Sequence, residues 1–145
     1  MSHKHTLYMQ QQLGRVMYIP PIEMNKRIAE ELDSLKRLYQ RQPSYLNQYD
    51  QLFRLVSIWL LVHEYDLTNH QPHQVLKAVC MLNCPNWDFD PMIQQRHLLK
   101  KGVVLSAEPA CFVVLQHGLN FFQAYLQAYD SLPKVNLQAE YQKRN

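Results

Sequence analysis

An eight-residue apolar run, Leu55 to Val62, constrains the fold of this chain more than any other feature. Ser57 is the one residue in that run with a hydroxyl group, and no charged residue interrupts it. The run is far too short to cross a bilayer, which requires about 20 apolar residues. A helix that is apolar on every side must be surrounded by other elements. The sequence therefore predicts a central buried helix that follows Pro43-Ser44 and extends to about Tyr65.

The rest of the chain carries mostly helical periodicity and contains only 3 Gly. A chain of 145 residues is long enough for one domain with a sizeable core. We therefore predict an all-α protein, an antiparallel helical bundle of four to five helices, with almost no place for β-strands. Residues 1–20 are expected to form an N-terminal arm or short helix, residues 21–132 the single bundle domain, and residues 133–145 a polar tail.

Helix boundaries follow from prolines, capping residues and apolar spacing. Besides the central helix, which Ser44 should cap, helices are predicted over residues 22–41, 72–84, 91–101 and 107–130. Ser106 should cap the last of these, and residues 66–71 should form a loop. In the helix over residues 22–41 the charged side chains, Glu31 among them, are assigned to the outer face. The inner stripe of that helix is expected to comprise Ile28, Leu32, Leu35 and Tyr39.

The cysteine count and the N-terminal residues bear on the cellular location, and the net charge bears on the partner. The chain has 3 Cys, an odd number, and its first residues do not form an apolar export signal. Both features favour reduced thiols and a cytoplasmic location. The net charge of +3 neither requires nor excludes an acidic partner.

Two histidines and two cysteines are the nearest approach to a metal site. His70, His73, Cys80 and Cys84 follow the spacing H-x2-H-x6-C-x3-C, and such ligands suit zinc. However, Cys80 belongs to an apolar stripe, and buried free cysteines are common. The spacing also matches no zinc module. We therefore predict no metal site and no cofactor, and retain these four residues only as candidates.

Two other histidines lie on apolar helices. His63 ends the central run, and His117 lies in the last helix. Either imidazole could act as a base near neutral pH. Neither has a Ser or Cys nucleophile at a recognisable spacing, so the favoured interpretation is a partly buried histidine bonded to a carbonyl.

The densest basic cluster is the segment from Arg96 to Gly102. Arg96, Lys100 and Lys101 place positive charge at one helix end, where a phosphate backbone would be attracted. These three residues are the predicted anion-binding or nucleic-acid-binding set. The alternative is a solvated helix end whose lysines complement the helix dipole.

The order of these features resembles the HEPN superfamily of small helical bundles. The resemblance runs from about Met24 to Tyr129 and includes the core helix around Tyr49 to Leu61, His73 at the next helix start, the segment led by Arg96, and a long closing helix. In that superfamily, the members with ribonuclease activity carry an Arg, often followed by a polar residue, and a His four to six positions after the Arg. The resemblance therefore implies that a catalytic member would show this motif in the segment led by Arg96.

This chain matches the front of that motif with Arg96 and His97, but Lys101 and its neighbours stand where the histidine is expected. Lys101 could replace it as a base only with a strongly lowered pKa. Arg96, His97 and Lys101 are thus the candidate catalytic residues, and the missing histidine argues against catalysis.

Three functions follow for testing. The first is a non-catalytic, HEPN-like binding or regulatory module, which the resemblance places in toxin–antitoxin or defence systems with nucleic-acid contact. The second is a variant metal-independent ribonuclease. The third is a protein-binding adaptor without nucleic acid, consistent with 9 Tyr, a residue type enriched at interfaces. The expected partners are a second copy of the chain or another protein, with RNA as a further candidate and no membrane.

Overall fold

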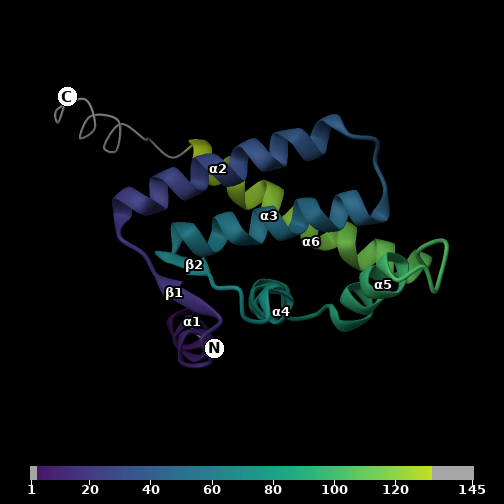
Figure 1. Cartoon of the computed structure of the whole chain (residues 1–145), viewed down its shortest axis with the longest axis horizontal. Coiled ribbons are helices and arrows are strands. Elements are labelled where there is room, and N and C mark those ends of the chain that lie inside the picture. Colours follow the sequence, from purple (N-terminus) through teal and green to yellow (C-terminus); the bar gives the residue numbers. More distant parts are fainter. Residues whose placement is uncertain (1–2, 132–145) are drawn as a thin grey trace.

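A computed structural model describes residues 3–131 of the chain. Within that range the chain is mostly helical, which confirms the predicted all-α class in its broad sense. The predicted tail, residues 133–145, lies outside the described residues. Figure 1 shows the order of elements, which comprises α1 (His3–Gln12), β1 (Val16–Tyr18), α2 (Pro21–Gln40), α3 (Tyr45–Val62), β2 (Tyr65–Leu67), α4 (Pro72–Asn83), α5 (Asp90–Lys100) and α6 (Pro109–Ser131).

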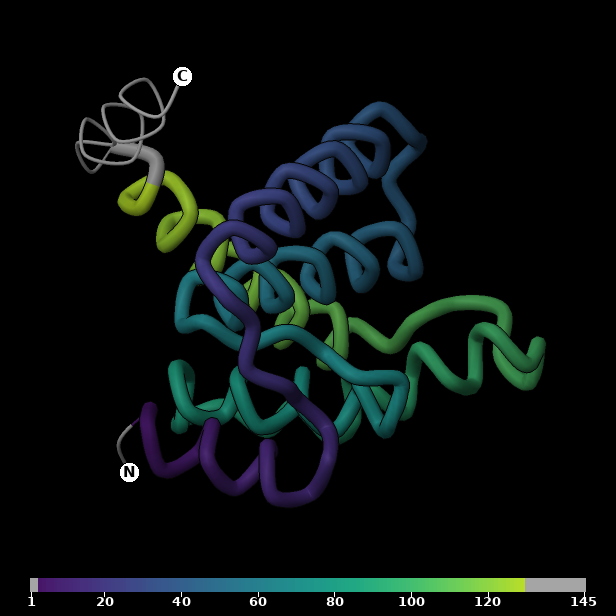
Figure 2. Tube along the Cα trace, turned by 60° about the vertical axis from the view of Figure 1, so that its left-hand side comes forward, coloured from purple at the N-terminus to yellow at the C-terminus, as the bar shows by residue number. Residues whose placement is uncertain are grey.

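Helix α3 is the centre of the molecule, as its apolar run predicts. Every residue from Leu55 to Leu61 is buried. The helix contacts α2, α4, α5, α6 and β2. Figure 2 shows α2 running beside α3 on one side of the molecule, while α1 lies on the opposite side. Burial of the whole run removes its apolar surface from water, and this is the main favourable contribution that this helix can make to folding.

The described residues contain six helices and one small two-stranded sheet, whose position the sequence does not predict. Strands β1 and β2 pair antiparallel, with Val16 opposite Leu67 and Tyr18 opposite Tyr65. The predicted central helix stops earlier than expected because Glu64 adopts φ +73° and reverses the chain. Two strands of three residues each are too short to show a period of two in the sequence.

The inner face of α2 also differs from its predicted stripe. Tyr39 is 49% exposed and Leu38 is buried in its place, while Glu31 is buried rather than on the outer face. Glu31 is accommodated because it pairs with two arginines, which satisfy its carboxylate inside the protein. Such a pairing across helices leaves no trace in the helical period of α2.

The predicted caps have different outcomes. Ser44 caps α3 as predicted, since its Oγ accepts a hydrogen bond from the Asn47 backbone N–H at 3.0 Å. Gly102 follows α5 with φ +71°, the left-handed conformation that glycine adopts without strain. Ser106 does not cap α6, which begins at Pro109 instead. Proline is favoured in a first helical turn because the N–H that it lacks would have no partner there.

In the described part of the chain, no helix combines the length and apolar character needed to cross a membrane.

Candidate anion-binding site

A cavity of about 380 Å³ lies between α2, α3, α4 and α5. Its lining includes four arginines and one carboxylate, so positive charge dominates it. We call this cavity the arginine pocket. The residues that line it are Ser34, Arg37 and Leu38 from α2, Arg41 directly after α2, Asp50, Phe53 and Arg54 from α3, His73 from α4, and Arg96 from α5.

Positions along two helices explain how the walls present their side chains. Arg37 lies in the last turn of α2, and Arg41 caps the end of that helix; both line the cavity. Asp50 and Arg54 are four residues apart on α3 and therefore share one face, with Phe53 beside them. The α2–α3 hairpin places these two groups of side chains on opposite sides of one cavity.

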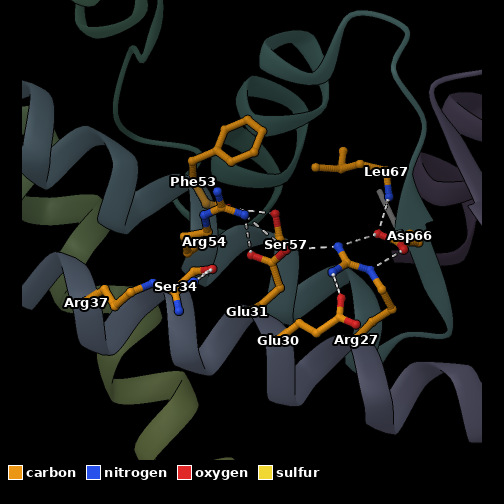
Figure 3. A network of polar contacts seen from close by, with 10 residues as sticks. All are labelled: Arg27, Glu30, Glu31, Ser34, Arg37, Phe53, Arg54, Ser57, Asp66 and Leu67. Carbon is orange, nitrogen blue, oxygen red and sulfur yellow. Dashed lines mark hydrogen bonds and ion pairs between the residues drawn. The ribbon is translucent and has the colours of Figure 1, made fainter.

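Arg54 is held in place by the buried carboxylate of Glu31. Nη1 of Arg54 lies 3.0 Å from Oε2 and 3.2 Å from Oε1 of Glu31, whose side chain is only 4% exposed. Arg27 donates to the same carboxylate at 2.9 Å and to Asp66 at 2.8 Å, which ties α2 to β2 (Figure 3). Glu31 therefore acts as a positioning residue for one wall of the pocket.

The other three arginines have no such neutralising partner. Among residues 3–131, Arg37, Arg41 and Arg96 form no ion pair with a carboxylate. Arg37 donates to the hydroxyl of Ser34, at 3.2 Å. The Nε of Arg96 is buried without a hydrogen-bond partner in that part of the chain. A buried donor without a partner costs free energy, which an anion accepting from it would recover.

Tyr49 links the histidine and the arginine at the back of the pocket. Its Oη lies 2.9 Å from Nδ1 of His73, and Arg96 Cζ lies 5.1 Å from the centroid of its ring. The second distance is that of a cation–π contact. Tyr49 is completely buried, so one side chain without access to water orients both neighbours.

Burial sets the protonation of this group. It lowers the pKa of His73, and the charges of Arg96 and Lys100 lower it further, while Asp50 acts in the opposite direction. Burial raises the pKa of Tyr49, so that side chain keeps its proton. His73 is therefore neutral at pH 7, and the Tyr49 hydroxyl can donate to its Nδ1, which leaves the ring proton on Nε2.

The residues predicted to bind an anion or to act in catalysis do not all lie in one place in the structure. Arg96 lines the pocket, whereas His97, Lys100 and Lys101 are exposed and do not. Although Lys100 does not line the pocket, its positive charge contributes to the lowered pKa of His73. The local sequence around Arg96 thus identifies one pocket residue, and the remaining pocket residues lie on three other helices or directly after one of them.

The four candidate metal ligands do not converge. His70 lies exposed before α4, while Cys80 and Cys84 are buried. Burial raises the pKa of both thiols, which disfavours the thiolate that binds metal. Within residues 3–131, no group of three or more His, Cys, Asp or Glu side chains is positioned to hold a metal ion.

His63 and His117 lie away from the pocket. Nδ1 of His63 is 2.7 Å from the Trp59 carbonyl oxygen, and its ring stacks on the Trp59 ring. This contact agrees with the predicted carbonyl bond. His117 is exposed and stacks on Trp87, with the ring centroids 4.2 Å apart. Burial lowers the pKa of His63.

One pocket residue that the sequence analysis did not select, Arg54, stands out in the sequence. Arg54 is the only Lys, Arg, Asp or Glu residue between Asp50 and Glu64, in an otherwise apolar helix. A charge at such a position requires a partner or a cavity, and the structure provides both. Arg37 and Arg41 had no comparable signal, because charged residues four apart are usual on a solvated helix face.

The arginine pocket can hold an anion by several guanidinium groups at once and place it beside a neutral imidazole. Comparison with known proteins does not identify the ligand: no family model, no curated protein and no solved structure matches this chain.

Proposed function

We propose that this protein is a non-catalytic binding module that holds a phosphate group of RNA in the arginine pocket. The observation that carries this proposal is the convergence of four arginines on one cavity. In the described part of the chain, three of them lack a carboxylate partner. Guanidinium groups present paired donors that match phosphate oxygens, so this lining favours phosphate over a small neutral ligand.

Aromatic and planar groups in the pocket favour a nucleotide over a simple inorganic anion. Phe53 lines the cavity, and its ring centroid lies 5.4 Å from that of His73. Single-stranded nucleic acids are bound by combining positive charge with rings or guanidinium planes on which bases stack. The pocket has both components.

The wider setting of this proposal depends on the sequence alone. The order of helices and the segment led by Arg96 support an antiparallel, HEPN-like bundle that acts as a dimer or with a protein partner in the cytoplasm. The same resemblance supports a role in a toxin–antitoxin or defence system.

One structural observation favours the variant ribonuclease as a second candidate. His73 lines the same pocket as Arg96, so a neutral imidazole is present although no histidine follows Arg96 at the motif spacing. A neutral imidazole can take a proton from a ribose 2′-hydroxyl, which here requires the other tautomer, with Nδ1–H donating to the Tyr49 hydroxyl and Nε2 free. This candidate predicts RNA cleavage by the purified protein that is lost in His73→Ala and retained in His97→Ala and Lys101→Ala. Intact RNA after incubation across pH 6 to 9 would exclude it.

RNA binding is tested with a fluorescent single-stranded RNA and two double variants, one at the C-terminal end of α2 and its cap and one along α2. Arg37→Gln with Arg41→Gln removes two pocket charges. Lys26→Gln with Lys36→Gln removes the same charge from exposed positions on the same helix that do not line the pocket. Fluorescence anisotropy at several salt concentrations gives the affinity and its salt dependence.

The pocket variant should weaken binding and reduce the slope of log K against log salt by about 0.7 for each lost phosphate contact. The lysine variant should leave the slope nearly unchanged. If both variants weaken binding equally, RNA is attracted by overall charge and the pocket is not its site. If the wild-type protein binds no RNA, the proposed function is wrong and the protein-binding adaptor becomes the better hypothesis.

A further inference from the structure

We infer that the arginine pocket receives a terminal phosphate monoester, at the end of an RNA strand or on a free nucleotide, rather than an internal phosphodiester. This inference rests on the proposed function, because it specifies which phosphate of the ligand is recognised.

The shape of the site favours a ligand end. The cavity measures about 380 Å³, is lined by side chains from α2 and its C-terminal cap, α3, α4 and α5, and is partly open to solvent. Pockets for small molecules begin at about 300 Å³. Proteins that bind the interior of a strand use a groove that follows several consecutive phosphates. The cavity therefore has the size of a site for one ligand end rather than that of a groove for several consecutive phosphates.

The charge of the site also favours a terminal group. An internal phosphodiester carries one negative charge, while a phosphate monoester carries about −1.5 to −2 at pH 7 and offers three acceptor oxygens. The pocket has four arginines against one lining carboxylate, Asp50, and only Arg54 is paired with a carboxylate among residues 3–131. A monoester therefore neutralises more of this charge than a diester does.

Two further contacts are available to a terminal nucleotide. The buried Nε of Arg96 lacks a partner in the described part of the chain, and a third phosphate oxygen could accept from it. The first base can then lie against the ring of Phe53, which lines the same cavity. An internal phosphate supplies one acceptor oxygen fewer, because two of its oxygens are esterified.

The test compares RNA octamers that differ only at their ends. Octamers with a 5′-phosphate or a 5′-hydroxyl carry the dye at the 3′ end, and octamers with a 3′-phosphate or a 3′-hydroxyl carry it at the 5′ end. Adenosine monophosphate and inorganic phosphate serve as unlabelled competitors, which separates strand ends from free nucleotides. Lengths of four, eight and twelve nucleotides test whether affinity depends on the interior of the strand.

We expect at least one phosphorylated end to bind about tenfold more tightly than its hydroxyl counterpart, the effect of one added charge-assisted hydrogen bond. Affinity should change little with length, and adenosine monophosphate should compete. The preference for the phosphorylated end should disappear in Arg37→Gln with Arg41→Gln and persist in Lys26→Gln with Lys36→Gln.

The inference would be overturned if RNAs with phosphorylated and hydroxyl ends bound equally well and if affinity rose with the length of the RNA. RNA binding at the pocket would remain supported in that case. Binding of adenosine monophosphate without any RNA binding would support the terminal monoester and contradict the RNA function. If RNA, adenosine monophosphate and inorganic phosphate all fail to bind, the inference and the proposed function are both wrong.

Discussion

Glu31→Gln should show how much stability the buried carboxylate of α2 provides. Glu31 accepts hydrogen bonds from Arg27 at 2.9 Å and from Arg54 at 3.0 and 3.2 Å, and its side chain is 4% exposed. Breaking a buried ion pair costs about 3–5 kcal/mol when the remaining charge stays out of water. The two arginine side chains are 32% and 40% exposed, so water can solvate them after the substitution. Glutamine also keeps one acceptor oxygen.

The expected loss is therefore smaller, about 2 kcal/mol in the free energy of unfolding. This corresponds to a decrease in Tm of about 4–8 °C for a chain of this size. Urea denaturation and thermal melting of the full chain, both followed by circular dichroism, provide the two measurements.

The matched control is Glu30→Gln, the same chemical change at the neighbouring position. Glu30 makes one ion pair with Arg27, and its side chain is 51% exposed. An exposed pair of this kind contributes about 0–1 kcal/mol. Equal unfolding free energies for Glu30→Gln and Glu31→Gln would refute the argument that burial gives Glu31 its importance.

Three further predictions concern the core, a helix cap and the pocket. Leu60→Ala should lower the unfolding free energy by about 2–5 kcal/mol in urea denaturation, because Leu60 is completely buried, and a loss under 1 kcal/mol would contradict the central position of α3. Ser44→Ala should cost about 1 kcal/mol by the same measurement, and no loss of stability would mean that the hydrogen bond to Asn47 is unimportant. Burial and Arg96 lower the pKa of His73, and a bound anion should raise it, so anion binding takes up a proton. Affinity for sulfate, measured by calorimetry, should therefore increase as pH falls from 8 to 6, by at most about tenfold per unit, and His73→Asn should remove this dependence. A pH-independent wild-type affinity would show that His73 does not sense the anion.

Local patterns identified the helices and their order. The apolar run in α3 required burial whatever its neighbours were, and Leu55 to Leu61 are indeed buried. The cap at Ser44 was predictable because it involves only the next three residues of the chain. Gly102 was predictable for the same reason, since only the preceding turn of helix determines the conformation that it must adopt.

Features that depend on distant residues were missed. Strands β1 and β2 form because segments nearly fifty residues apart are brought side by side, and neither strand is long enough to be detected alone. Glu31 was assigned to the outer face because its partner Arg54 lies on another helix. Tyr39 was assigned to the core because spacing alone cannot show which flank of α2 faces α3.

For the functional site, the sequence determined which groups are available: an arginine at position 96, a histidine at position 73, and helices that hold each of them in a defined orientation. Only the tertiary structure decided that Arg96 and His73 share a cavity with Arg37, Arg41 and Arg54, while Lys100 and Lys101 remain outside it. The physical reason is that helical periodicity fixes the face on which a side chain lies, whereas helix packing decides what that face meets. A cavity whose lining comes from four helices is a consequence of packing.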